Sequence, residues 1–326
     1  MRLLSERDLH AIVDPDLLID ASEDAFRMLS DGRAQIPPRT ELQLPQGGTF
    51  FVMPGVVSDA YFGLKLIASR SDRDGPGTKT TSLILLIDAK TLSPLGMFSS
   101  DWFTDMRTAA GLAAATRRLA LPSARSLAVY GTGKLADPTI RLLCRVRKFE
   151  RVMIVGRNPA RSEELCALLR QDNDFRNIAF DLDIDGDAAA AEADVIATVT
   201  SAERPVFDGR RVSPGVHINV AGAFRPDNRE IDDSIAAAAF FYVDSLDACL
   251  ARAGDIVIPL QNGALSRDRI RGEIGSMIAG QIPGRSSETE ITVFKSLGNA
   301  VQDLHLGGIV LGAAGNKGID FEPTDA

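Results

Sequence analysis

A glycine-rich turn far from the N-terminus constrains the fold of this chain more than any other feature. Ser126–Tyr130 reads as a short buried strand, Gly131-Thr132-Gly133-Lys134-Leu135-Ala136 follows it directly, and a helical pattern begins at Asp137. The first glycine would make a tight turn, the second would let the backbone approach phosphates, and the small third residue would let the helix pack on the strand. The helix N-terminus would present free N–H groups to an anion. The alternative is an ordinary turn between strand and helix, but the order of strand, turn and helix favours a dinucleotide site.

Composition narrows the functional class. A chain of 326 residues is long enough for two domains, and its net charge of −8 argues against nucleic acid or an anionic membrane as partner. No stretch of about 18 apolar residues occurs, so we expect no membrane span, and the N-terminus lacks the apolar run of a signal peptide. Three widely spaced cysteines fit a reducing cytoplasm, and three histidines that form no cluster predict no metal site.

From Ser126 onward the pattern alternates between strands and helices, which predicts an α/β fold with a doubly wound, parallel Rossmann sheet. We place this nucleotide-binding domain at residues 123–302. The predicted strands and helices of this domain are Ser126–Tyr130, Arg151–Val155, Pro159–Gln171, Ile178–Leu182, Ala188–Ala193, Val195–Thr200, Gly215–Ala221 and Ala239–Val243. The segment Ile291–Leu311 is predicted to be helical.

The residues before the turn predict a separate α+β domain at residues 1–122. A C-terminal helix at about 303–326 is expected to join it. The predicted helices and strands of the domain at residues 1–122 are Glu6–His10, Pro15–Leu29, Thr40–Leu44, Thr49–Gly55, Tyr61–Ala68, Ser82–Ile87, Pro94–Phe98 and Thr104–Leu119. A loop is predicted at Asp72–Gly77.

The end of the second predicted Rossmann strand bears on the choice of cofactor. NAD-selective folds place an acidic residue there to hold the ribose hydroxyls. This chain has Gly156-Arg157-Asn158 instead, with Arg161 four residues further along. An arginine can pair with a 2′-phosphate and stack on adenine, although a solvated arginine in a loop is the simpler interpretation. The pattern favours NADP(H), with Arg157, Asn158 and Arg161 as contacts and NAD(H) as the alternative.

Three basic residues of the first domain are candidates for chemistry. These are Arg39 after Pro37-Pro38, Lys65 inside the apolar run Phe62–Ile67, and Arg107 within a predicted helix. Lys65 is either an edge residue that faces water or an inward, functional cation. Buried lysines shift their pKa readily and act as acids or bases.

The chain resembles the ornithine cyclodeaminase and mu-crystallin family over nearly its whole length. The resemblance rests on short motifs that occur in the same order. They are Pro38-Arg39, Gly63-Leu64-Lys65, Leu83–Asp88, Thr104-Asp105-Met106-Arg107-Thr108-Ala109-Ala110, the glycine turn, Ala193-Asp194-Val195, Thr198–Ser201, Pro214–Ala223, Thr292–Gly298 and Gln302-Asp303-Leu304.

The resemblance implies that the domain at residues 1–122 binds substrate and forms a homodimer. It also implies roles for individual residues. Arg39 and Lys65 match an arginine and a lysine that bind the substrate carboxylate, and Arg107 matches an arginine that lies where substrate and nicotinamide meet. Leu297 matches a residue near the nicotinamide and is expected to contact substrate as well. The remaining cofactor contacts that the resemblance implies are Thr81, Lys134, Leu135, Thr200, Ser201, Val220, Ala221, Gly222 and Ser296.

One position departs from the cyclodeaminase pattern. Ornithine cyclodeaminases of the family carry an aspartate two residues before a proline, and it acts on the δ-amino group. Phe224 stands at that position, in Gly222-Ala223-Phe224-Arg225-Pro226. Phenylalanine cannot accept a proton, but it can form an apolar wall against a substrate ring. Family members that reduce cyclic imines do not need the aspartate.

Three functions follow from the resemblance. The first is the NAD(P)H-dependent reduction of a cyclic imino acid, such as Δ1-pyrroline-2-carboxylate or piperideine-2-carboxylate, by a homodimer. In it Arg39 orients the carboxylate, Lys65 binds it or donates a proton, and Arg107 holds the carboxylate or a cofactor phosphate. The second is an ornithine cyclodeaminase or alanine dehydrogenase. The third is a non-catalytic NADPH-binding protein like mu-crystallin, against which intact Arg39, Lys65 and Arg107 argue.

Overall fold

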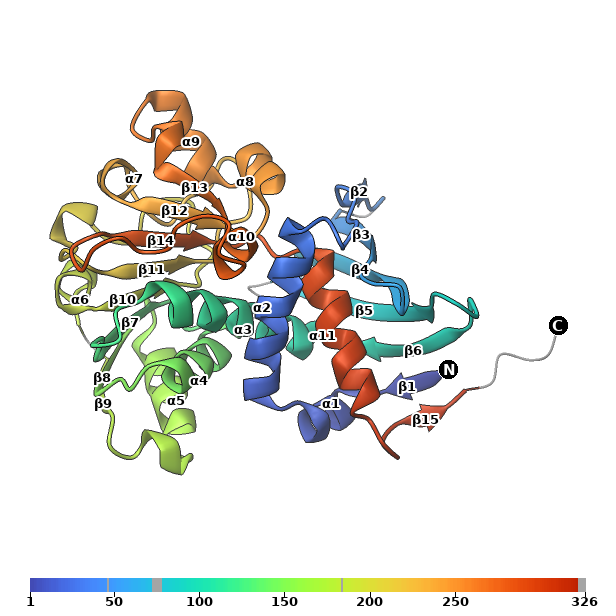
Figure 1. The fold of residues 1–326 in the computed structure, drawn as a ribbon. Coiled ribbons are helices and arrows are strands. Elements are labelled where there is room, and N and C mark those ends of the chain that lie inside the picture. Colours follow the sequence, from blue (N-terminus) through green and yellow to red (C-terminus); the bar gives the residue numbers. More distant parts are fainter. Residues whose placement is uncertain (46, 72–77, 183, 322–326) are drawn as a thin grey trace. The chain divides into compact units, whose positions relative to one another are not determined.

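The computed structural model describes residues 1–45, 47–71, 78–182 and 184–321. It divides the chain into two compact units, each built on its own sheet (Figure 1). Unit 1 comprises Met1–Arg107 with Gly298–Ala326, and unit 2 comprises Thr108–Leu297. Each unit is described by itself below.

The sheet of unit 1 has seven strands in the order β15-β1-β6-β5-β4-β3-β2. Strands β1 and β6 run parallel, and the other neighbours in this sheet run antiparallel. The strands are β1 (Arg2–Leu4), β2 (Thr40–Gln43), β3 (Thr49–Val56), β4 (Tyr61–Ser71), β5 (Thr78–Asp88), β6 (Pro94–Ser99) and β15 (Ile319–Asp320).

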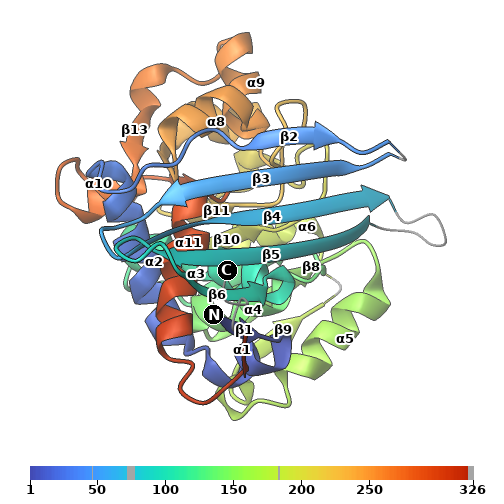
Figure 2. The ribbon, with the colours of Figure 1, turned by 90° about the vertical axis from the view of Figure 1, so that its right-hand side faces the viewer.

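Helices cover one face of this sheet. They are α1 (Glu6–Ile12), α2 (Pro15–Ser30), the first part of α3 (Asp101–Leu119) and α11 (Ala300–Gly312). Helix α2 begins where Asp14 accepts hydrogen bonds from two backbone N–H groups, with Pro15 in its first turn. Helix α11 packs against α2 and against strands β3, β4 and β5. Figure 2 shows β2–β5 with α2 and α11 behind them, so the opposite face of these strands is turned to the viewer.

The C-terminal segment of unit 1 differs from the expected helix at about 303–326. Helix α11 ends at Gly312, and strand β15 pairs antiparallel with β1, which was not expected as a strand. Gly315 and Gly318 have positive φ angles of 54° and 84°, which end the helical path and turn the chain back. Residues 322–326 and the expected loop Asp72–Gly77 lie outside the described residues.

Unit 2 contains an eight-stranded sheet in the order β13-β12-β14-β11-β10-β7-β8-β9, and its paired strands run parallel. This confirms the α/β fold with a doubly wound sheet. The strands are β7 (Ser126–Tyr130), β8 (Arg151–Val155), β9 (Ala179–Asp181), β10 (Val195–Thr198), β11 (His217–Val220), β12 (Phe240–Val243), β13 (Ile270–Glu273) and β14 (Thr292–Lys295). The helices are α4 (Ala136–Val146), α5 (Pro159–Leu169), α6 (Gly186–Glu192), α7 (Asp233–Ala238), α8 (Leu246–Arg252), α9 (Gly254–Asn262) and α10 (Ile274–Ile278), besides the rest of α3.

The prediction of one helix over Ile291–Leu311 is wrong in its first part. Strand β14 lies between β11 and β12, and helix α11 begins only at Ala300. All four residues of β14 are buried. A strand buried on both faces of a parallel sheet lacks the alternating pattern that identifies strands, so its apolar run reads like part of the following helix.

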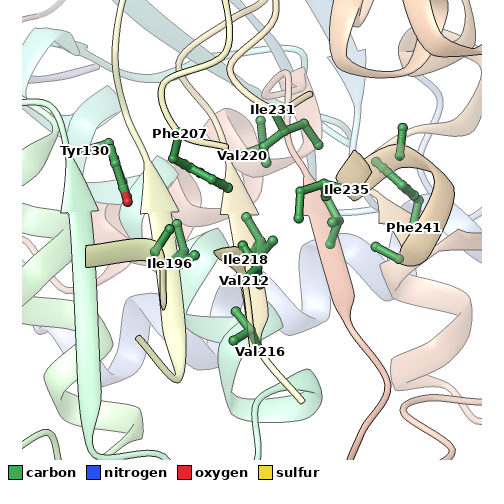
Figure 3. Packing of buried hydrophobic residues seen from close by; sticks show 14 of the residues in the cluster. Tyr130, Ile196, Phe207, Val212, Val216, Ile218, Val220, Ile231, Ile235 and Phe241 are labelled. Carbon is green, nitrogen blue, oxygen red and sulfur yellow. The ribbon is translucent and has the colours of Figure 1, made fainter. Parts of the chain in front are cut away.

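The core of unit 2 lies against the middle strands of the sheet. Figure 3 shows Ile196, Ile218 and Val220 pointing from β10 and β11 toward one face, where Phe207 packs. Strand β7 has β8 on one side and β10 on the other, so the chain changes direction across the sheet beside β7. In such sheets ligands bind at the carboxyl ends of the strands at this switch point. The glycine turn follows β7 and therefore lies at that edge.

Candidate functional site

The glycine turn after β7 has the backbone shape that a phosphate needs. Gly131 has a φ of +112°, and a Cβ there would lie 2.7 Å from the carbonyl oxygen of Val199, so a side chain does not fit. A Cβ on Gly133 would meet no atom within 4 Å. The turn is thus tight at its first glycine and open at its second. The open side leaves room for a group that approaches the backbone.

The N-terminus of α4 is suited to an anion. Its N-cap residue, Leu135, makes no side-chain hydrogen bond to the helix. The positive end of the helix dipole is therefore available, with Lys134 exposed beside it. Asp137 in the first turn accepts a hydrogen bond from Arg141 at 2.8 Å, and this ion pair offsets its charge.

The end of β8 carries a glycine in place of an acidic side chain. A Cβ on Gly156 would lie 2.7 Å from Cγ2 of Thr132 and 2.9 Å from Oγ of Ser162. Arg157, Asn158 and Arg161 are all exposed. Two exposed guanidinium groups beside a glycine give this edge of the sheet a positive character.

The loop after β10 uses the Thr200 hydroxyl internally. Oγ1 of Thr200 donates to Oε1 of Glu230 at 2.7 Å and accepts from the backbone N–H of Ala202 at 3.0 Å. The next residue, Ser201, is exposed. Of these two cofactor candidates, Ser201 therefore has the freer hydroxyl.

The loop after β11 is held by the same glutamate. The backbone N–H groups of Gly222 and Ala223 donate to Oε2 of Glu230 at 2.7 and 3.0 Å. A Cβ on Gly222 would lie 2.0 Å from the carbonyl oxygen of Thr200, so the two loops touch. Val220 is buried at the end of β11, and Ala221 donates its N–H to the carbonyl of Thr198 at 3.0 Å.

Two further candidates follow β14. Oγ of Ser296 and the backbone N–H of Leu297 both donate to Oδ2 of Asp244, at 3.0 and 2.8 Å. Asp244 follows β12, so it fixes the end of one strand against the next. Phe224 is 48% exposed, a high value for a large apolar side chain, and this fits a surface that contacts a ligand.

In unit 1, Lys65 is an inward cation. It lies on β4 with no exposed surface, and its Nζ donates to Oγ1 of Thr104 at 2.7 Å and to Oδ1 of Asp303 at 2.8 Å. Burial lowers the pKa of Lys65 to about 8, while the negative charge of Asp303 opposes this shift. An ammonium has three N–H donors, and these two bonds use two of them. Because the side chains around Lys65 cover it completely, they must shift for a ligand to reach Nζ.

Arg107 shares the same carboxylate. Its Nε lies 2.9 Å from Oδ1 of Asp303, and its Nη1 donates to Oε1 of Gln302 at 3.5 Å. Three buried donor atoms in this part of unit 1 make no aligned hydrogen bond: Nε of Arg107, Nε2 of Gln302 and Nδ2 of Asn299. Oδ2 of Asp303 likewise has no hydrogen-bond partner, so the cluster has both donors and one acceptor that a ligand could satisfy.

The structure places the other two candidates of unit 1 differently. Thr40 pairs with Val52, so Arg39, one residue before Thr40, lies opposite Met53. Met53 pairs in turn with Lys65, so Arg39 and Lys65 are two strand spacings, about 10 Å, apart. The guanidinium of Arg39 lies 5.5 Å from the ring of Phe51. Thr81 is exposed on the face of the sheet opposite to Lys65, because Lys65 pairs with Ile84 and side chains alternate.

Sequence reasoning did not assign Asp303 or Glu230 to the site. Asp303 lies in the motif Gln302-Asp303-Leu304, and a carboxylate within an otherwise apolar helix was the available signal. For Glu230 the sequence gives no such signal, because its partners lie in loops far from it along the chain.

In the described residues, no group of three or more His, Cys, Asp or Glu side chains is placed to share a metal ion. Over the same residues, no helix is both long enough and apolar enough to cross a membrane.

Comparison with known proteins gives extensive matches. The sequence model of the ornithine cyclodeaminase/mu-crystallin family matches residues 1–317. A Δ1-pyrroline-2-carboxylate reductase of Bacillus cereus is 32% identical over 308 residues, which cover 93% of this chain and 94% of the relative. The structure of the Thermococcus litoralis Δ1-pyrroline-2-carboxylate reductase with NADH and L-proline has a TM-score of 0.89 at 28% identity, covering 98% of this chain and 100% of the other. A dimeric archaeal alanine dehydrogenase with bound NAD has a TM-score of 0.91 at 27% identity, covering 99% of each chain.

Proposed function

The chain belongs to the ornithine cyclodeaminase/mu-crystallin family, and we propose that it is an enzyme that reduces a cyclic imino acid of the Δ1-pyrroline-2-carboxylate type with a nicotinamide cofactor. The observation that carries the proposal is the buried cluster of Lys65, Arg107 and Asp303 in unit 1. Relatives that share about a third of the sequence over nearly its full length are reductases of this imino acid.

The charges of the cluster suit one carboxylate. Lys65 and Arg107 are two buried cations, and Asp303 is the one carboxylate paired with both. Asp105 adds a weaker negative charge near Lys65, and an anion placed between the two cations would be stabilised by both. The guanidinium of Arg107 is the group that would hold the carboxylate of an imino acid, which leaves the third N–H of Lys65 for the imine nitrogen. Arg39, on the same face of the sheet, would add a bidentate contact.

Reduction of the C=N bond needs a proton on nitrogen as well as a hydride on carbon. The bound nicotinamide supplies the hydride. Lys65, with a pKa of about 8, is protonated at neutral pH yet can release its proton, so its Nζ is the candidate donor to the imine nitrogen. Asp303 would hold the ammonium in place during this transfer.

Phe224 disfavours cyclodeamination. A phenyl ring neither takes a proton from an amino group nor pairs with an ammonium, whereas it can pack against a ring. Its 48% exposure leaves a face of the ring for that contact. A reductase of a preformed imino acid needs no titratable group at this position.

Unit 2 has the features to hold the cofactor. Gly131, Gly133 and the N-terminus of α4 would bind the pyrophosphate, and Ser201, Ser296 and Leu297 would line the nicotinamide side. We propose a preference for NADP(H), because Gly156 supplies no carboxylate for the ribose hydroxyls and Arg157 and Arg161 are exposed beside it. The three unpaired cysteines fit a cytoplasmic enzyme.

We also propose a homodimer formed through unit 1. The face of its sheet opposite to Lys65 carries Leu64 paired with Leu85 and Leu66 paired with Leu83, and Leu83 is 39% exposed. An apolar sheet face of this kind, left uncovered by helices, is stabilised by a partner (Figure 2). The dimeric archaeal relative supports this assignment.

The first test measures turnover. The wild-type protein is expected to oxidise NADPH or NADH with Δ1-pyrroline-2-carboxylate faster than with pyruvate and ammonia, and to release no ammonia from L-ornithine. Lys65→Met should lower kcat/KM by about 10²- to 10⁴-fold, because the cluster loses the proton donor. Lys90→Met, an exposed lysine of the same unit, is the matched control and should be neutral. Cofactor binding without turnover of any imino acid would contradict the proposal.

The second test concerns the cofactor. Arg157→Ala should raise the KM for NADPH about tenfold and leave the KM for NADH unchanged, because only NADPH carries the 2′-phosphate. Arg170→Ala, at the other end of α5, is the control. A wild-type protein that uses NADH in preference, with no change in Arg157→Ala, would overturn the NADP(H) assignment.

The third test concerns assembly. Leu85→Glu should convert the homodimer to a monomer in light scattering after gel filtration, because a charge on the apolar sheet face opposes its burial. Leu168→Glu changes an exposed leucine of unit 2 and should leave the mass unchanged. A monomeric wild-type protein would refute the homodimer.

A further inference from the structure

A single buried glutamate joins two loops at the carboxyl edge of the unit 2 sheet. Glu230 has no exposed surface. Its Oε1 accepts from the backbone N–H and the hydroxyl of Thr200, at 2.8 and 2.7 Å. Its Oε2 accepts from the backbone N–H groups of Gly222 and Ala223, at 2.7 and 3.0 Å. One oxygen therefore serves the loop after β10, and the other serves the loop after β11.

The backbone of Glu230 is fixed in turn by hydrogen bonds to Asp255. Oδ1 of Asp255 accepts from the backbone N–H of Glu230 at 2.6 Å and from that of Ile231 at 3.2 Å. Oδ2 of Asp255 pairs with Nζ of Lys295 at 2.8 Å, and the same Nζ donates to the carbonyl oxygen of Ala223. Lys295 is the last residue of β14, so this network ties the ends of three neighbouring strands together.

Lys295 keeps its positive charge in this network. Burial opposes the charge on Lys295, but the carboxylates of Asp255 and Glu230 outweigh it and raise the pKa of Lys295. Its ammonium thus stays a donor over the whole range in which the protein would be assayed. The four donors around Glu230 likewise require an acceptor at both of its oxygens.

We propose that Glu230 is a positioning residue that fixes these two loops in the shape that binds the cofactor, an inference that rests on the proposed function. The loops carry Ser201, Ala221 and Gly222, which are cofactor candidates. A Cβ on Gly222 would lie 2.5 Å from Oε1 of Glu230, so the loop packs directly on the carboxylate. Glu230, having no exposed surface, acts through the loops.

The substitution Glu230→Gln isolates this role. Glutamine offers one acceptor oxygen and one NH₂ group, so the NH₂ would face N–H donors of one loop and release that loop. Glu290→Gln is the matched control. Glu290 is 8% exposed, accepts from the backbone N–H of Ser286 at 2.9 Å, and precedes β14 at the opposite edge of the sheet.

The experiment titrates the full-length wild type and both variants with NADPH and with NADH, followed by cofactor fluorescence, and then measures steady-state kinetics. We expect Glu230→Gln to raise the Kd and the KM of the cofactor by about 10- to 100-fold, because misplaced loops lose their alignment. The KM of the imino acid should stay unchanged, and Glu290→Gln should bind the cofactor like the wild type. The melting temperature of each variant measures its general loss of stability. The control Glu290→Gln is expected to share any such loss with Glu230→Gln, but not the change in cofactor binding.

The outcomes separate the two proposals. A wild-type protein that binds neither NADPH nor NADH overturns the proposed function and this inference with it. A wild-type protein that binds cofactor with the same Kd as Glu230→Gln overturns the inference alone. If Glu230→Gln does not fold, Glu230→Asp replaces it, since aspartate keeps the charge but is too short to reach both loops. Glu230→Asp should weaken cofactor binding in the same direction, and an unchanged Kd would overturn the inference.

Discussion

The ion pair between Lys65 and Asp303 is the interaction on which unit 1 depends. An ammonium without exposed surface needs a counter-charge, and the carboxylate that pairs with Nζ at 2.8 Å comes from a position 238 residues away. Removing one partner of such a pair costs about 3–5 kcal/mol. Helix α11 must therefore return to β4, although the whole of unit 2 intervenes in the chain. The same carboxylate also pairs with Arg107, so it holds both cations of the cluster.

Unit 2 also has buried charged groups that fix its structure, but they are mainly carboxylates where unit 1 has buried cations. Its buried carboxylates, Glu230, Asp244 and Asp255, accept from loop N–H groups or from Lys295 at the ends of parallel strands. Loops at this edge have little apolar contact to fix them, so hydrogen bonds to charged acceptors determine their shape. Both units thus place buried charge near the residues to which we assign ligand binding.

Local features of the fold could be predicted from sequence, whereas long-range partners could not. The limits of β7 and β8 follow from short apolar runs bounded by turns, and the tight turn at Gly131 follows from its spacing. The sequence of strand β14 predicts a helix, because a strand buried on both faces shows no alternation of apolar and polar residues. Lys65 could be noticed as a break in an apolar strand, but its direction depends on Asp303, which approaches only in the fold. Glu230 lies on no motif whose spacing indicates a function.

The most direct test of the account is the pH dependence of kcat/KM for reduction of Δ1-pyrroline-2-carboxylate, in the wild type and in Asp303→Asn. Lys65 is charged below its pKa of about 8, so wild-type kcat/KM should fall as the pH rises through that value. Loss of the Asp303 carboxylate lowers the pKa of Lys65 further, so the fall should move to lower pH in the variant. Profiles with the same midpoint in both proteins would contradict the assignment of Lys65 as the cation that binds and protonates the substrate.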